Sequence, residues 1–189
     1  MTDATPPTEA RLADAQVRND ALAMAAVQDV THGMMVGLGT GRAASRGIQA
    51  LAARVRDGEL ERIVTVATSI RSAELARSLG LSVVPMSDVT RVDLLFDGAD
   101  EVDPNLCMTK GAGGAMTREK IVAEAADHCI YLIDESKLVD HLGTRFPLPV
   151  ELLHFGVQAV MARLRAVGLN PCVRPAAAAD DESAQPPTT

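Results

Sequence analysis

Aromatic residues are scarce in this chain of 189 residues: they make up 2% of it, and tryptophan is missing altogether. Proteins that bind single-stranded nucleic acid stack bases on aromatic side chains, so this class is disfavoured. Basic residues are also in the minority, with 18 against 25 acidic residues and a formal net charge of −7. That balance argues against a protein that binds a nucleic-acid backbone through its phosphates.

Cysteine is limited to three residues, Cys107, Cys129 and Cys172, an odd number without metal-ligand spacing. We therefore expect neither a disulfide framework nor a metal site, and a reducing cytoplasm is the expected compartment. No uncharged apolar run approaches the roughly 18 residues that a membrane span needs. The first residues also lack the basic and apolar regions of a signal peptide. The expected protein is cytoplasmic, with no membrane partner.

Both ends of the chain are rich in proline and polar residues. We expect residues 1–8 to be a disordered lead and residues 175–189 to be a disordered tail, because such segments bury too little apolar surface to offset the entropy of ordering. The chain as a whole is 47% hydrophobic and 23% charged, an ordinary globular composition. It is long enough for one domain with a hydrophobic core.

Short apolar runs alternate with amphipathic segments, which is typical of a parallel sheet flanked by helices. The expected strands are 34–38, 62–67, 81–85, 92–96 and 128–134. The expected helices are 9–30, 42–56, 115–126 and 155–167, with another that Thr68-Ser69 caps and Gly80 ends. We predict a Rossmann-like α/β domain over residues 9–146.

Three polar clusters follow expected strands, and ligands of open parallel sheets bind at the carboxyl ends of the strands. The first cluster is the turn Gly39-Thr40-Gly41-Arg42, which opens a helix. Backbone N–H groups in such a turn can face an anion, and the helix dipole favours negative charge there. A tight turn that needs glycine only for its backbone angles is the alternative, and from spacing alone both stay open.

The second cluster is Asp97-Gly98-Ala99-Asp100-Glu101, which carries three carboxylates. Their repulsion can raise the pKa of one of them, so that a shared site holds a proton donor and a base. An ordinary surface turn explains the same Asp-Gly sequence.

The third cluster is a glycine-rich loop, residues 110–114, followed by Glu119 in the next expected helix. A lysine beside flexible backbone suits an oxyanion or a phosphate, and Glu119 can act as a general base if its side chain points inward. Since Glu119 stands in an Arg-Glu-Lys triplet, a solvated helix face is the alternative. Lys137 follows the fifth strand, and on its own it would be a surface lysine.

Taken together, these clusters strongly resemble the ribose-5-phosphate isomerase type A family. The matching stretches are VGLGTG (36–41), ATSIRSAELARSLGL (67–81), DLLFDGADEVDPNL (93–106), KGAGGAMTREKIVA (110–123), DESKLVDHLG (134–143) and PLPVEL (147–152). They occur in the family's order and nearly its spacing. The resemblance implies the interconversion of ribose 5-phosphate and ribulose 5-phosphate through a cis-enediolate, without a metal or organic cofactor, by a homodimer or larger assembly.

The resemblance also implies roles for individual residues. Glu119 matches the base that carries a proton between C2 and C1. Asp97 and Asp100 match residues near the sugar ring oxygens, with Asp97 favoured as the helper in ring opening, and Lys110 supplies fixed positive charge. The residues expected to bind the sugar phosphate are Gly39, Thr40, Gly41, Arg42, Gly98, Gly111, Gly113 and Lys137. These roles match the needs of proton abstraction next to a carbonyl: a base, an oxyanion partner and a remote anchor.

The sequence departs from the family pattern at three places. Arg42-Ala43 stands where the family usually has Ser-Thr, so two hydroxyl donors give way to one guanidinium, which can bind a phosphate through two hydrogen bonds. Asn19 aligns with a position where the family often has a lysine. After Arg174 the family continues with further strands, so residues 147–174 are expected to be the remnant of a small α+β domain.

Three other interpretations stay open at this point. A sugar-phosphate sensor on the same fold, without turnover, is compatible with the altered phosphate loop and the shortened second domain. A degenerate, inactive fragment is compatible with the same features. An NAD-dependent Rossmann enzyme is the least favoured of the three, because no acidic partner for a ribose follows the second expected strand.

Overall fold

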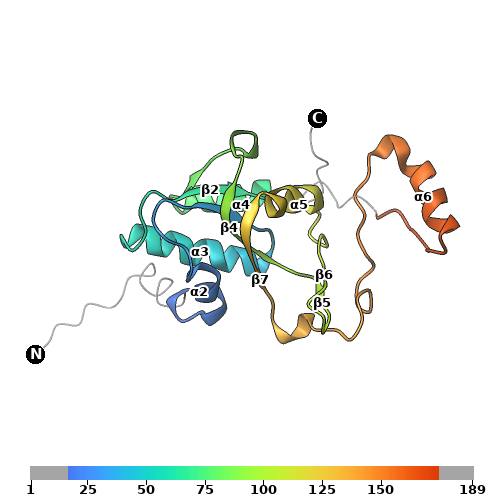
Figure 1. Ribbon diagram of the computed structural model, residues 1–189, viewed down its shortest axis with the longest axis horizontal. Coiled ribbons are helices and arrows are strands. Elements are labelled where there is room, and N and C mark those ends of the chain that lie inside the picture. Colours follow the sequence, from blue (N-terminus) through green and yellow to red (C-terminus); the bar gives the residue numbers. More distant parts are fainter. Residues whose placement is uncertain (1–16, 175–189) are drawn as a thin grey trace, which may run out of the picture.

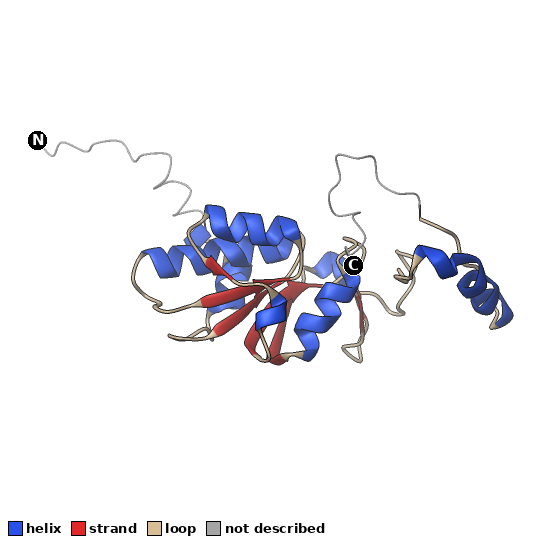
Figure 2. Ribbon diagram, turned by 90° about the horizontal axis from the view of Figure 1, so that it is seen from above, coloured by secondary structure: helices blue, strands red, loops and turns tan. Residues whose placement is uncertain are grey.

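The computed structural model describes residues 17–174, so the expected disordered lead and tail lie outside the described residues. Its centre is a five-stranded parallel sheet in the order β3-β2-β1-β4-β7, with helices on both faces (Figures 1 and 2). The predicted α/β class is confirmed. The strands are β1 (Met35–Leu38), β2 (Val64–Ala67), β3 (Ser82–Val83), β4 (Val92–Gly98) and β7 (Ala126–Leu132). The helices are α2 (Ala21–Val27), α3 (Arg42–Arg56), α4 (Ile70–Ser78), α5 (Met116–Glu124) and α6 (Val157–Ala166).

The helix predicted over 9–30 is wrong in its extent within the described residues, and its first part, residues 9–16, lies outside them. Residues 17 and 18 are helical, but Asn19 and Asp20 interrupt the helix before α2 begins. The Asp20 side chain accepts a hydrogen bond from the N–H of Ala23 (3.0 Å) and so caps α2. Aspartate favours this position because its carboxylate satisfies an N–H group that has no partner inside the helix.

Helix α3 has the predicted bounds, and most other boundaries shift by a few residues. β7 begins and ends two residues earlier than predicted, and β3 is only two residues long. Ser69 caps α4 as predicted by accepting a hydrogen bond from the N–H of Ser72 (3.1 Å). Gly80 follows the end of α4 with φ +85°, a conformation that glycine adopts without strain.

The strand order creates a switch point between β1 and β4. From β1 the chain moves outward through β2 to β3, and it then returns to β4 on the other side of β1. The connections that leave β1 and β4 therefore diverge and open a crevice at the carboxyl ends of the strands. Thr40 follows β1 and Gly98 ends β4, so both lie at this crevice.

A two-stranded antiparallel hairpin, which the sequence did not predict, follows β4. β5 (Glu101–Val102) pairs with β6 (Met108–Thr109), and the N–H of Asp100 donates to the carbonyl of Thr109 (2.9 Å). Strands of two residues are too short to show an alternating pattern. The hairpin brings the chain back to the end of β4, so that Lys110 lies beside Asp100.

The packing of β4 fixes the helices that surround the crevice. Phe96 is fully buried with residues of α3, where Gly47 leaves room for the ring: a Cβ at Gly47 would lie 2.7 Å from Cε2 of Phe96. Leu95 belongs to a second core with Val122 of α5. Since successive side chains of a strand point to opposite faces, β4 anchors helices on both sides. The helix that carries Glu119 is thereby held on the sheet.

Residues 147–174 contain α6, which stands apart from the sheet (Figures 1 and 2). Both ends of this segment contact the catalytic domain expected from the sequence. Glu151 accepts a hydrogen bond from the N–H of Thr117 at the start of α5 (2.9 Å), and Arg174 donates to the carbonyl of Ala112 (2.9 Å). That the segment is a remnant of a second domain stays a prediction. No helix in the described part of the chain is long and apolar enough to cross a membrane.

Candidate active site

A cavity of about 380 Å³ lies at the carboxyl ends of β1, β4 and β7. This volume falls within the range of small-molecule sites, roughly 300–1,000 Å³. Most residues that the sequence predicted for the site line this cavity: Thr40, Gly41, Arg42, Gly98, Asp100, Lys110, Gly111, Gly113, Glu119 and Lys137. The other two do not line it: Gly39 directly precedes Thr40 in the chain, and Asp97 contacts Thr40, Gly98 and Lys110.

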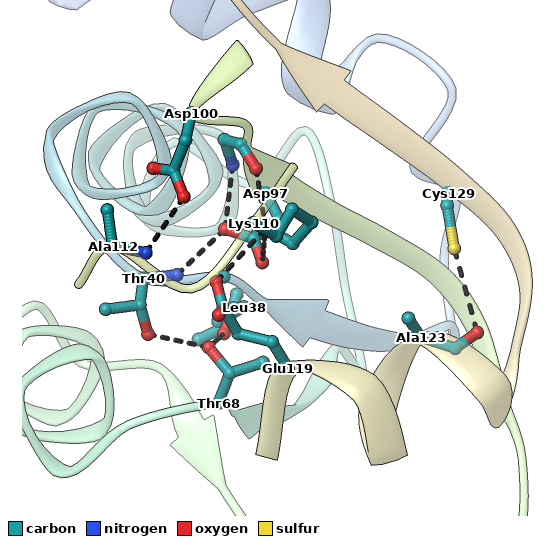
Figure 3. Close-up of polar contacts among 12 residues, drawn as sticks. Leu38, Thr40, Thr68, Asp97, Asp100, Lys110, Ala112, Glu119, Ala123 and Cys129 are labelled. Carbon is teal, nitrogen blue, oxygen red and sulfur yellow. Dashed lines mark hydrogen bonds and ion pairs between the residues drawn. The ribbon is translucent and has the colours of Figure 1, made fainter. Parts of the chain in front are cut away.

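Asp97 is fully buried at the end of β4 and connects three parts of the site (Figure 3). Its Oδ1 accepts hydrogen bonds from the N–H groups of Thr40 (3.0 Å) and Gly98 (2.7 Å), and its Oδ2 lies 2.9 Å from Nζ of Lys110. Gly39 makes this approach possible, because a Cβ there would lie 2.2 Å from Oδ1. Asp97 therefore ties the glycine turn, β4 and the lysine together.

The ammonium of Lys110 lies between two carboxylates. Its Nζ donates to Asp97, to the carbonyl of Gly98 (2.6 Å) and to Oε1 of Glu119 (3.1 Å). It also lies 5.4 Å from the centroid of the Tyr131 ring. Burial lowers the pKa of Lys110, but the charges of Asp97 and Glu119 outweigh burial, so that the pKa lies above its ordinary value. Lys110 is thus a fixed positive charge beside both acids.

Glu119 points into the cavity, although its neighbours Arg118 and Lys120 are exposed. Lys110 holds Oε1, whereas Oε2 is buried and has no hydrogen-bond partner within residues 17–174. Burial raises the pKa of Glu119 to about 7; the charge of Lys110 opposes the rise and that of Asp97 adds to it. A carboxyl group with a pKa near neutrality suits general base and acid catalysis at neutral pH.

Asp100 fixes the glycine-rich loop above the cavity. Its Oδ2 accepts a hydrogen bond from the N–H of Ala112 (2.8 Å), as Figure 3 shows. Gly111 has φ +101°, and a Cβ there would also lie 2.4 Å from Cγ of Met116, so this position requires glycine. Gly113 approaches Thr40: a Cβ at Gly113 would lie 3.8 Å from the Thr40 methyl group. The loop and the glycine turn therefore face each other.

Three basic residues of the cavity wall lie around the carboxylate of Asp134 and form the basic end of the cavity. Arg42 and Arg46 lie four residues apart on one face of α3, and Lys137 ends the short 3-10 helix η2 (Glu135–Lys137) after β7. Arg46 is paired with Asp20 (2.5 Å). The N-terminus of α3 has neither a side-chain cap nor an acidic residue in its first turn. Its N–H groups and dipole therefore favour an anion at this end.

The structure also adds residues that the sequence did not single out. They are Leu22, Arg46, Leu132, Ile133 and Asp134, while Ala43 and Ala99, named above beside Arg42 and in the second cluster, also line the cavity. Arg46 was recognisable as one helical turn after Arg42, and Asp134 as a residue at the end of a parallel strand. Glu101 belongs to the same sequence cluster as Asp97 and Asp100, but it does not line the cavity. Within residues 17–174, no group of three or more His, Cys, Asp or Glu is arranged to hold a metal ion.

Comparison with known proteins agrees with the resemblance in the sequence. The family model of ribose 5-phosphate isomerase A (phosphoriboisomerase A) matches residues 64–189. Ribose-5-phosphate isomerase A of Synechococcus sp. (strain JA-3-3Ab) is 45% identical over 170 residues, which cover 89% of this chain and 74% of that protein. The protein of the same name from Roseiflexus castenholzii is 48% identical over 149 residues, which cover 79% of this chain and 64% of that protein.

Solved structures give the same result. The structure of ribose 5-phosphate isomerase A from Methanocaldococcus jannaschii matches with a TM-score of 0.74 at 40% identity, over 78% of this chain and 65% of that chain. This chain thus spans between 64% and 74% of the length of these three proteins. The identity, the shared fold and the extent of the family match lead to one conclusion: the chain belongs to the ribose 5-phosphate isomerase A family.

Proposed function

We propose that the chain interconverts ribose 5-phosphate and ribulose 5-phosphate by moving a proton between C2 and C1. One observation carries this proposal: Lys110 holds one oxygen of Glu119, and the other is buried and unpartnered in a side chain that lines the cavity. A base for proton abstraction from carbon needs such an oxygen, free of other hydrogen bonds and close to a fixed positive charge. The names of the relatives give this activity to those proteins.

The reaction uses Glu119 first as a base and then as an acid. Oε2 takes the proton from C2 of the open-chain aldose, and the electron pair of that bond forms the C1–C2 double bond of a cis-enediolate. Negative charge develops on O1, where the nearby Lys110 stabilises it. Glu119 then returns the proton to C1, O2 becomes the carbonyl oxygen, and the hydroxyl proton of O2 passes to O1. These steps conserve both the atoms and the total charge of the substrate and Glu119.

The phosphate of the substrate belongs at the basic end of the cavity. Arg42, Lys137 and the N-terminus of α3 supply positive charge and N–H donors there. Binding the phosphate at a distance from the reacting carbons provides energy that positions C1 and C2. Ring opening is assigned to the two aspartates: Asp100 faces the cavity, and the fully buried Asp97 acts through Lys110.

The proposal is tested by incubating the full chain with ribose 5-phosphate and measuring ribulose 5-phosphate. Glu119→Gln should lower kcat by about 10²- to 10⁴-fold, the usual contribution of a general base. Glu124→Gln is the matched control, because Glu124 lies on the same helix with an exposed side chain. A wild-type chain that binds ribose 5-phosphate without making product would be a sensor instead. An unchanged kcat in Glu119→Gln would remove this residue from the mechanism.

We also propose that the chain forms a homodimer or larger assembly in the cytoplasm. Several apolar side chains of residues 147–174 are exposed, among them Leu153 (75%) and Phe155 (102%), and apolar surface of this kind favours association. Three free, exposed cysteines fit a reducing compartment. Light scattering of the native protein should give a multiple of 19.9 kDa, and a mass of one chain at micromolar concentration would contradict the assembly.

A further inference from the structure

Glu101 is a fully buried carboxylate next to Asp100 in the sequence, yet it lies outside the cavity wall. It accepts three backbone hydrogen bonds: from Gly143 to Oε2 (2.5 Å), and from Arg145 (2.5 Å) and Phe146 (3.1 Å) to Oε1. Burial raises the pKa of Glu101, but these N–H donors and the charge of Arg145 outweigh burial, so that the pKa lies below its ordinary value. The loop 143–146 is therefore tied to an ionised carboxylate.

The same loop supports the cation that ends η2. The ring of Phe146 has its centroid 5.8 Å from Nζ of Lys137, within the distance of a cation–π contact. The guanidinium of Arg145 donates to the carbonyl of Ser136, the residue before Lys137. Glu101 thus holds the backbone of Arg145, whose side chain contacts Ser136, and the backbone of Phe146, whose ring contacts Lys137.

A second contact connects β5 with the residues that follow Lys137. Val102 forms a parallel bridge with Leu138, and its carbonyl accepts a hydrogen bond from the N–H of Val139 (3.0 Å). β5 therefore supports Lys137 in two ways: by backbone pairing after it, and through Glu101 and the loop 143–146. The backbone pairing does not depend on the side chain of Glu101, so the two supports can be separated by substitution.

We propose that Glu101 is a positioning residue that holds Lys137 at the basic end of the cavity, ready to bind the substrate phosphate. This inference rests on the proposed function, because it uses the role assigned to Lys137. A lysine side chain loses much rotamer freedom when it binds a ligand, and a structure that restricts it beforehand lowers this cost. Glu101 acts through Lys137 and does not touch the substrate.

Glu101→Gln keeps the size of the side chain but removes its charge and places an NH2 group or a single oxygen opposite the N–H donors. The loop 143–146 should loosen and release Lys137. We expect the KM for ribose 5-phosphate and the Kd for inorganic phosphate, measured by 31P NMR titration, to rise by the same factor. That factor is about three- to tenfold, as for one flexible side chain that must be immobilised on binding, while kcat stays within about twofold.

The double variant with Lys137→Met separates positioning from a general structural role. In the Lys137→Met background, Glu101→Gln should raise neither the KM nor the phosphate Kd any further. An equal rise in both backgrounds, or a fall in kcat at constant KM, would overturn the inference. If Glu101→Gln does not fold, Phe146→Leu takes its place: it removes the ring above Lys137, and its effect should likewise vanish with Lys137→Met.

The outcomes also distinguish this inference from the proposed function. A wild-type chain that binds phosphate but does not isomerise ribose 5-phosphate contradicts the proposed function alone, since the phosphate titration still reports on Glu101. A wild-type chain that isomerises ribose 5-phosphate, with a KM and a phosphate Kd unchanged by Glu101→Gln, overturns only the role of Glu101. A wild-type chain that neither binds phosphate nor isomerises ribose 5-phosphate overturns both the proposed function and the role of Glu101.

Discussion

The ionisation of Glu119 should make the stability of the folded protein depend on pH. The pKa of this carboxyl is raised from an ordinary 4.5 to about 7 in the folded chain, first of all because it is buried. Between these two values the folded state binds more protons than the unfolded state, so the free energy of unfolding falls as pH rises. The stabilising contribution is complete below pH 4.5 and is lost as the pH passes through about 7.

The expected size follows from the same two pKa values. Each unit of pKa corresponds to about 1.4 kcal/mol, so Glu119 should lower the free energy of unfolding by roughly 3 kcal/mol between pH 4.5 and pH 8. Glu119→Gln is neutral throughout this range and keeps an oxygen that can face Lys110. The free energy of unfolding of the variant, relative to wild type, should therefore increase by roughly 3 kcal/mol from pH 4.5 to pH 8.

Urea unfolding at several pH values between 4.5 and 8 measures this difference directly. The exposed Glu124→Gln variant serves as the control, and its stability should run parallel to that of wild type at every pH. Parallel curves for wild type and Glu119→Gln would refute the reasoning, because they would mean that Glu119 ionises in the folded protein as it does in water.

Three further substitutions test other parts of the site. Lys110→Met removes the charge that opposes the raised pKa of Glu119, so the acidic limb of the pH–activity profile should move to higher pH and kcat at pH 7 should fall. Arg42→Ala should raise the KM about tenfold at nearly constant kcat, since it removes a charged hydrogen bond to phosphate. Gly39→Ala places a Cβ 2.2 Å from a buried carboxylate oxygen, so it should lower the melting temperature and abolish activity.

Each of these substitutions has its own control or contrary result. For Lys110→Met, an acidic limb that stays in place or moves to lower pH would contradict the coupling with Glu119. Arg56→Ala is the control for Arg42→Ala. Because Arg56 lies at the far end of the same helix, its substitution should leave the KM unchanged. Gly156→Ala is the control for Gly39, because a Cβ at Gly156 meets nothing within 4 Å. Equal melting temperatures for the two alanine variants would show that Gly39 is not sterically required.

The sheet and the position of the site were predictable because they depend on local pattern. Short β-branched and apolar runs gave the parallel strands, and the carboxyl ends of such strands meet at one edge. Thr40 and Gly98 could therefore be placed at a common crevice. The small hairpin of β5 and β6 was not predictable, since strands of two residues carry no periodicity.

Side-chain direction was harder to predict than the fold. The triplet around Glu119 left open whether this residue faces water, and only the packing of Val122 against β4 turns it inward. Asp97 and Glu101 come from one acidic cluster, yet their environments differ: one holds a lysine at the cavity and the other holds a loop through backbone N–H groups. Such differences arise from tertiary contacts that spacing in the sequence does not encode.

Isomerisation of ribose 5-phosphate in D2O, followed by NMR, tests the role of Glu119 most directly. If this carboxyl carries the hydrogen between C2 and C1, its proton can exchange with solvent while the enediolate exists, and ribulose 5-phosphate should gain deuterium at C1. Glu119→Gln should slow both product formation and deuterium uptake. Product that forms at the wild-type rate in Glu119→Gln would contradict proton transfer through this side chain.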